Sequence, residues 1–109
     1  MKRYCLTLDL KNDPTLIEEY KGIHKAIWPE IAKSIKDAGI HVMDIYLHGN
    51  RLFMIMETED SFSFYSKSIM DKANPKVQEW ETLMWKYQQA LPTGQPDEKW
   101  VLMDRIFSL

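Results

Sequence analysis

The chain of 109 residues contains 45% hydrophobic and 28% charged residues, which is typical of a single globular domain spanning residues 1–109. Its 14 basic and 16 acidic residues leave a net charge of -2, which argues against nucleic acid or an acidic membrane surface as a partner. Cys5 is the only cysteine, so neither an internal disulfide nor a paired-cysteine metal site is available. With no signal sequence and no apolar run of membrane-spanning length, these features predict a cytoplasmic protein.

The first part of the chain is predicted to form a strand and then a helix. Residues 3–10 alternate between apolar and polar side chains, which indicates a half-buried strand. Asp13 and Pro14 supply the cap and the first turn of a helix over residues 14–38. Pro29 lies inside this stretch and lacks an amide hydrogen, so we expect the helix to kink or break there.

Residues 40–58 are predicted to form a β-hairpin around Gly49-Asn50. A two-residue turn sets four pairs of residues opposite each other: His48 and Arg51, Tyr46 and Phe53, Ile45 and Met54, Met43 and Met56. One face of the hairpin is wholly apolar and is predicted to lie under helices: Met43, Ile45, Leu47, Leu52, Met54 and Met56. The other face keeps four apolar residues that a monomer would leave to water: Val42, Tyr46, Phe53 and Ile55. This surplus predicts a homodimer formed through the sheet.

The remaining elements are predicted in chain order: a helix over 61–70 begun by Ser61, a helix over 75–90 begun by Asn74, a loop with Pro92, Gly94 and Pro96, and a buried strand over 99–107. The order strand, helix, strand, strand, helix, strand indicates an α+β fold of the ferredoxin-like, or split βαβ, type. In this fold an antiparallel sheet carries its helices on one face, and two copies would form a dimeric α/β barrel.

Tyr20, His24 and Trp28 are spaced four residues apart and therefore share one row on the first helix. The pKa of an imidazole lies near neutrality, so His24 suits proton transfer in both directions. Aromatic rows commonly fill a core, and a lone buried histidine is more often structural than catalytic. From the spacing alone, both interpretations stay open.

The other two histidines lie on the hairpin. Strand alternation places His41 on the face of Met43, where it could approach the first helix, and His48 at the solvated turn. The three histidines show none of the short spacings that hold zinc, so no metal site is expected. Cys5 is interpreted as a small apolar residue of the first strand.

Four tryptophans in a chain of this length include candidates for binding a sugar ring. Flat aromatic rings pack against the C–H faces of sugars while carboxylates fix their hydroxyls, and Trp80-Glu81 offers both groups. Trp80, Met84 and Tyr87 lie on one helix face. Three charge runs are interpreted as solvated surface: Glu18-Glu19, Asp71-Lys72 and Asp97-Glu98-Lys99.

The stretch EEYKGIHKAIWPEI, residues 18–31, resembles the signature of the L-rhamnose mutarotase family. The similarity covers nearly the whole chain through three further segments: Asp44-Ile45-Tyr46, Phe53-Met54 and Gln78-Glu79-Trp80. The resemblance implies a ferredoxin-like dimer that interconverts the α and β anomers of a 6-deoxy-L-sugar without a cofactor. By position it implies that Tyr20 binds substrate, that His24 is the proton donor, and that Trp80 is the first of a sugar-binding tryptophan pair.

Two positions depart from the family pattern, since Glu81 stands where the second tryptophan is expected and Met43 where a tyrosine is expected. The sugar is therefore left open between L-rhamnose and L-fucose, and the counter-base is unassigned. Catalysis is assigned to His24 and substrate contact to five residues: Tyr20, Trp28, Met43, Trp80 and Glu81. The alternatives are a cofactor-free monooxygenase, a haem-binding protein of the same architecture, and a non-catalytic ligand-binding dimer.

Overall fold

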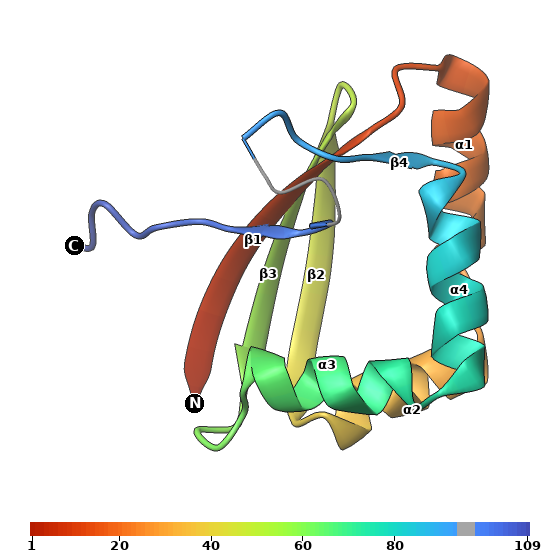
Figure 1. Cartoon of the computed structure of the whole chain (residues 1–109). Coiled ribbons are helices and arrows are strands. Elements are labelled where there is room, and N and C mark those ends of the chain that lie inside the picture. The colour runs from red at the N-terminus through yellow and green to blue at the C-terminus, as the bar shows by residue number, and fades with distance from the viewer. Residues whose placement is uncertain (94–97) are drawn as a thin grey trace.

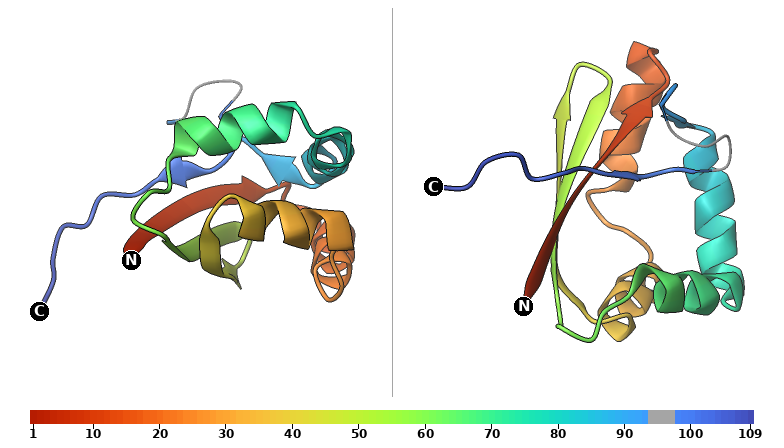
Figure 2. Two further views of the ribbon diagram at one scale, coloured as in Figure 1. Left: turned by 90° about the horizontal axis from the view of Figure 1, so that it is seen from below. Right: turned by 60° about the vertical axis from the view of Figure 1, so that its left-hand side comes forward.

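An antiparallel sheet carries all the described helices on one of its faces (Figures 1 and 2). The structure, a computed structural model, describes residues 1–93 and 98–109. The strands are β1 (Lys2–Leu10), β2 (Ile40–His48), β3 (Arg51–Thr58), β4 (Gln88–Gln89) and β5 (Val101–Leu102). They are arranged in the order β2-β3-β1-β4, with β5 also paired to β1. This order confirms the predicted α+β, ferredoxin-like fold.

The four described helices are α1 (Pro14–Ile23), α2 (Pro29–Asp37), α3 (Phe64–Lys72) and α4 (Pro75–Trp85). Three of them begin at a polar cap whose side chain accepts hydrogen bonds from backbone amides of the first turn: Asp13, Ser63 and Asn74. Helix α2 has no such side-chain cap and begins instead at Pro29, directly after Trp28.

The expected interruption at Pro29 is a full break. Helix α1 ends at Ile23, His24 is its C-terminal cap, and α2 starts five residues later. Trp28 has an extended backbone with ψ of 136°, as expected for the residue before a proline. The break turns α2 away from α1 (Figure 1), and in the connection His24, Ile27 and Trp28 are partly buried while Lys25 and Ala26 are exposed.

The hairpin register matches the prediction at all four pairs, from His48 opposite Arg51 to Met43 opposite Met56. Gly49 in the turn has φ of +60°, a conformation that costs glycine little. A register shift between Ile40 and Val42 leaves His41 as an extra residue in the strand. The His41 ring lies 3.4 Å from the Glu59 carboxylate, so the expectation that His41 approaches the first helix was wrong.

The apolar face of the hairpin is covered unevenly. On β3 the side chains of Leu52, Met54 and Met56 are buried, as predicted. On β2, at the edge of the sheet, Ile45 and Leu47 are each 36% exposed and line an open pocket between β2 and α1. The prediction of a fully covered apolar face therefore holds for β3 and fails for β2.

The second half of the chain differs from the prediction at three boundaries. Helix α3 begins after Ser63 rather than at Ser61, because Phe62 is buried in a core cluster ahead of the helix. Helix α4 ends at Trp85 instead of Ala90, since Gln88 and Gln89 pair with β1 as β4. The predicted loop at 92–96 lies partly outside the described residues, because Gly94 and Pro96 belong to the undescribed segment.

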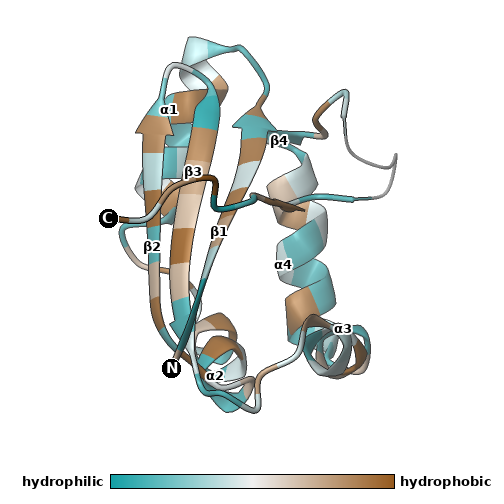
Figure 3. Ribbon diagram, turned by 90° about the vertical axis from the view of Figure 1, so that its left-hand side faces the viewer, coloured by the Kyte–Doolittle hydropathy of each residue, from teal (hydrophilic) through white to brown (hydrophobic). Residues whose placement is uncertain are grey.

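The predicted strand over 99–107 is reduced to β5 and one further hydrogen bond, from the Met103 amide to the Cys5 carbonyl. Beyond it the chain projects from the sheet on the side away from the helices (Figures 1 and 3). Ile106 and Phe107 are 96% and 75% exposed, so they were wrongly predicted as part of a buried strand. On the open sheet face, Tyr46 is 58% exposed and Val42 36%.

Candidate active site

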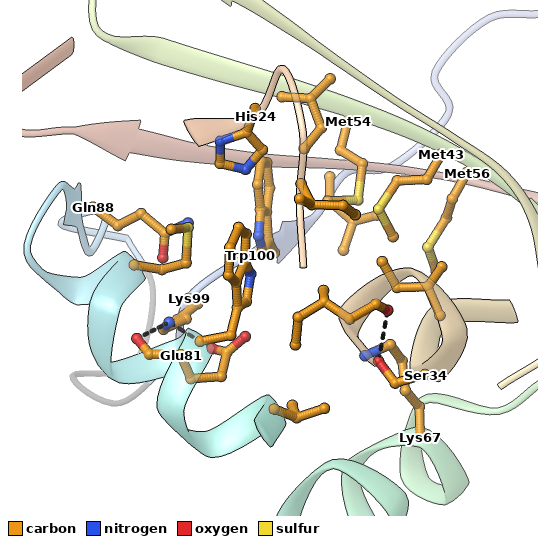
Figure 4. A pocket seen from close by; sticks show the side chains of 18 of the residues that line it. His24, Ser34, Met43, Met54, Met56, Lys67, Glu81, Gln88, Lys99 and Trp100 are labelled. Carbon is orange, nitrogen blue, oxygen red and sulfur yellow. Dashed lines mark hydrogen bonds and ion pairs between the residues drawn. The ribbon is translucent and has the colours of Figure 1, made fainter. Parts of the chain in front are cut away.

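A cavity of about 280 Å³ lies between the sheet and the helices (Figure 4). This volume is near the lower end of the range of roughly 300–1,000 Å³ for ligand pockets, which suits a small ligand. Its polar lining includes seven side chains, of which Gln88 belongs to β4 and Lys99 lies just before β5: Tyr20, His24, Ser34, Lys67, Glu81, Gln88 and Lys99. The sheet contributes Leu6, Met43, Ile45, Met54 and Met56.

His24 reaches the cavity because it caps the C-terminus of α1. Its Nδ1 lies 2.9 Å from the Tyr20 carbonyl oxygen, which can only accept, so Nδ1 carries the hydrogen and Nε2 the lone pair. Burial lowers the pKa of His24 below its ordinary value of 6.5, and the hydrogen bond to Tyr20 partly opposes this shift. At neutral pH the ring is therefore uncharged, with Nε2 available as a base.

Tyr20 packs against His24, with 4.2 Å between the ring centroids, and is only 4% exposed. Gln88 Nε2 donates to the Tyr20 hydroxyl oxygen at 3.2 Å, which leaves the hydroxyl hydrogen free to donate elsewhere. Burial raises the pKa of the Tyr20 phenol, so it remains protonated at neutral pH. The amide oxygen of Gln88 is buried without a hydrogen-bond partner in this cavity wall.

Trp80 forms part of the same wall. Its ring meets the His24 ring edge-on at 5.7 Å and the Trp28 ring edge-on at 5.2 Å. Trp80 lines the cavity, whereas Trp28 is not among its lining residues and packs against the core cluster that contains Trp80. Trp28 therefore supports Trp80 from outside the cavity.

A charged corner lies below His24 in Figure 4. Lys99 Nζ is 2.5 Å from Glu81 Oε2 and donates to the Glu81 carbonyl oxygen at 3.1 Å. Burial lowers the pKa of Lys99, and the adjacent Glu81 carboxylate opposes this shift. The interpretation of Asp97-Glu98-Lys99 as solvated surface was wrong for Lys99, whose side chain is 15% exposed, while Asp97 lies outside the described residues.

The comparisons with known proteins match this chain to sugar mutarotases. The sequence profile of the L-rhamnose mutarotase family matches residues 3–109. An L-fucose mutarotase of Xanthomonas campestris pv. campestris is 40% identical over 111 residues, covering 100% of this chain and 89% of the relative. An L-rhamnose mutarotase of Phocaeicola vulgatus is 34% identical over 99 residues, covering 89% of this chain and 86% of the relative. The chain belongs to the L-rhamnose mutarotase family.

A solved structure shares the fold of this family member. The crystal structure of an L-rhamnose mutarotase from Formosa agariphila has a TM-score of 0.73 at 21% identity, covering 100% of this chain and 99% of that chain. Family membership confirms the resemblance seen in residues 18–31 and the expected class of enzyme, a carbohydrate isomerase that interconverts sugar anomers. The monooxygenase, haem-binding and non-catalytic alternatives are not favoured.

Five of the six residues assigned to the site from the sequence line the cavity: Tyr20, His24, Met43, Trp80 and Glu81. The polar and aromatic lining residues that sequence reasoning missed include Ser34, Lys67, Gln88, Lys99 and Trp100. Gln88 gave no signal because it was placed inside a helix, and Lys99 was hidden in a charge run. Gln88 reaches the cavity through the pairing of β4 with β1, which the local sequence pattern did not predict, and Lys99 lies two residues before β5.

The described residues, 1–93 and 98–109, contain neither a candidate metal cluster nor a candidate membrane-spanning helix. Within these ranges no group of three or more histidine, cysteine, aspartate or glutamate side chains could hold a metal ion. None of the described helices has both the length and the apolar composition needed to span a bilayer.

Proposed function

We propose that this chain interconverts the α and β anomers of a 6-deoxy-L-sugar, with His24 as the acid–base group. The observation that carries this proposal is the lone pair of His24 Nε2 in a cavity of sugar size, fixed by the hydrogen bond from Nδ1 to the Tyr20 carbonyl. Mutarotation needs a proton removed from the anomeric hydroxyl and one delivered to the ring oxygen. The free aldehyde then rotates, and the ring closes on either face.

In this mechanism His24 Nε2 takes the proton of the anomeric hydroxyl, because the lowered pKa keeps the ring neutral beforehand. The Tyr20 hydroxyl donates a hydrogen bond to the ring oxygen, since it accepts from Gln88 and keeps its own hydrogen. As the bond between the anomeric carbon and the ring oxygen breaks, its electron pair stays on the ring oxygen, which takes the proton from protonated His24 while the Tyr20 hydrogen bond stabilises its charge. His24 thereby serves as base and as acid in one cycle.

The remaining walls suit a sugar that has one polar and one apolar side. Trp80 offers a flat surface for C–H groups, and Glu81 an acceptor for hydroxyls. Opposite them, Met43, Met54 and Met56 form an apolar surface on which the methyl group of a 6-deoxy sugar would pack. Of the two candidate sugars we expect L-fucose, since a relative 40% identical over the whole chain is named an L-fucose mutarotase.

The test is saturation-transfer NMR on L-fucose and L-rhamnose, where anomeric exchange is seen directly without a coupling enzyme. We expect the unmodified chain to make anomeric exchange faster than it is in buffer alone. In His24→Ala the rate of catalysed exchange should fall about 10²–10⁴-fold, the usual contribution of general acid–base catalysis. Circular dichroism checks that the variant stays folded. Full activity in His24→Ala would remove the histidine from this role, and no acceleration of any sugar would refute the function.

We also infer that the protein is a cytoplasmic homodimer that pairs through the open face of the sheet. Tyr46 and Val42 on that face, and Ile106 and Phe107 in the projecting C-terminal segment, leave apolar surface in contact with water. A twofold dimer would cover both regions at once. Sedimentation at micromolar concentration should give twice the mass of the chain, and a monomer would contradict the inference.

A further inference from the structure

The ion pair between Lys99 and Glu81 lines the cavity together with Trp80. Lys99 Nζ makes three contacts, with the Glu81 carboxylate, with the Glu81 carbonyl oxygen, and with the Trp85 ring, whose centroid lies at 4.6 Å. With three contacts and only 15% of its side chain exposed, the ammonium group has one defined position. Because Lys99 contacts both the carboxylate and the carbonyl oxygen of Glu81, it restrains the conformation of the Glu81 side chain relative to its backbone.

Glu81 differs from Lys99 in remaining accessible, with 42% of its side chain exposed. One carboxylate oxygen contacts Lys99, and the other is directed away from Lys99 toward the interior of the cavity (Figure 4). Trp80 and Gln88, on the same wall, fix the neighbouring surface. The second oxygen is thus an acceptor aimed at the space that a ligand would fill.

We propose that Lys99 is a positioning residue that fixes Glu81 so that its second carboxylate oxygen accepts hydrogen bonds from hydroxyls of the bound sugar. This inference rests on the proposed function and adds the part of the site that distinguishes one sugar from another. An ionised carboxylate only accepts hydrogen bonds, so it selects ligands that present hydroxyl donors at this place.

Fixing the carboxylate matters because a glutamate side chain has several rotatable bonds whose freedom is lost on binding. An acceptor that is already held in place binds more tightly than one that must first be ordered. A sugar whose hydroxyl points elsewhere would leave this charge without a donor, which is a strong basis for discrimination. L-fucose and L-rhamnose differ in the orientation of hydroxyl groups, so the pair can choose between them.

The experiment compares four single variants and the double variant Lys99→Met/Glu81→Gln of the full chain in the NMR exchange assay. Lys99→Met removes the charge and keeps an apolar stem over Trp85, Lys99→Arg keeps the charge, and Glu81→Gln removes the strong acceptor. The matched control is Lys33→Met, which removes a lysine from the Lys33–Asp37 pair on α2, outside the cavity lining. KM and kcat are measured for the preferred sugar and for analogues that each lack one hydroxyl.

We expect Lys99→Met and Glu81→Gln each to raise KM about tenfold with kcat little changed, as for one charge-assisted hydrogen bond. Lys99→Arg should restore most of the affinity, and Lys33→Met should match the unmodified chain. The analogue lacking the hydroxyl bound by Glu81 should lose affinity with the unmodified chain and lose almost none in Glu81→Gln. The double variant should be no worse than Glu81→Gln alone, because Lys99 acts through Glu81.

Unchanged KM in Lys99→Met, or strictly additive effects in the double variant, would overturn the proposal. Sugar titrations by ligand-observed NMR in the His24→Ala background measure binding without turnover. If catalysis proves independent of His24 while Lys99→Met still weakens binding in this background, the mechanism fails and the positioning role stands. If the unmodified chain binds no sugar at all, both fail.

Discussion

The two walls of the cavity differ in chemistry. The wall on the side of the helices, called the helical wall, presents Tyr20 and His24 from α1 and its cap and Gln88 from the short strand β4, linked by hydrogen bonds through the Tyr20 backbone and hydroxyl. The sheet wall presents only apolar side chains, mainly methionines, from β1, β2 and β3. Reactive groups are therefore on the side where the helix break and the irregular strand ends place single residues, and the regular sheet contributes shape.

This division has a physical origin. Inward-facing side chains of a sheet must be apolar to form the core, because a buried polar group without a partner is costly. Helix ends and short strands can carry polar side chains into the interior, since backbone groups nearby satisfy them, as the Tyr20 carbonyl does for His24. The comparison predicts that substitutions in the helical wall lower the rate of the chemical step, whereas substitutions in the sheet wall change how well the sugar fits the cavity.

The largest effect on activity should come from protonating His24 in the helical wall. As pH falls, kcat/KM should decrease about tenfold per unit below the pKa of His24, with a midpoint below 6.5 because burial lowers this pKa. Stability should fall in the same direction, since the unfolded chain binds the proton more readily than the folded one.

A profile of kcat/KM between about pH 4.5 and 8, which spans the titration of histidine, would measure this fall in activity, the acidic limb of the profile. His41→Gln and His48→Gln should keep the limb, because neither histidine lines the cavity. If the limb disappears in either of these variants while His24 is intact, the assignment to His24 is wrong.

A smaller effect is expected from Gln88→Leu. The substitution removes the donor that orients the Tyr20 hydroxyl, so kcat should fall about five- to tenfold, as expected for one hydrogen bond. Thermal unfolding should show a loss of stability of about 1 kcal/mol, because the buried Tyr20 hydroxyl loses its donor, whereas the amide oxygen had no partner to lose. Gln89→Leu, at the adjacent exposed position, is the control, and equal kcat values for both variants would exclude a role for Gln88.

The smallest effect is expected on the sheet wall. Met43→Leu conserves volume and apolar character, so kcat/KM should stay within about twofold of the unmodified chain. Steady-state kinetics with L-fucose and L-rhamnose would measure it. A loss of more than about tenfold in kcat would mean that the sheet wall takes part in the chemistry.

The first half of the chain was predictable because its signals are local. Alternation in residues 3–10, the proline at 29 and the glycine turn at 49 each specify backbone geometry within a few residues. The second half depends on distant partners, since Gln88 and Val101 become strand residues only by pairing with β1. A two-residue strand has no periodicity of its own, so helix and strand boundaries there were wrong.

The sequence by itself determined the family, the fold class and the row of Tyr20 and His24, because these depend on periodicity, turn residues and a long signature. Only the tertiary structure decided which ring nitrogen of His24 is free, that Gln88 pairs with Tyr20, and that Lys99 pairs with Glu81. Those contacts join residues up to 68 positions apart in the chain. Their geometry exists only after the sheet and helices have packed around a common cavity.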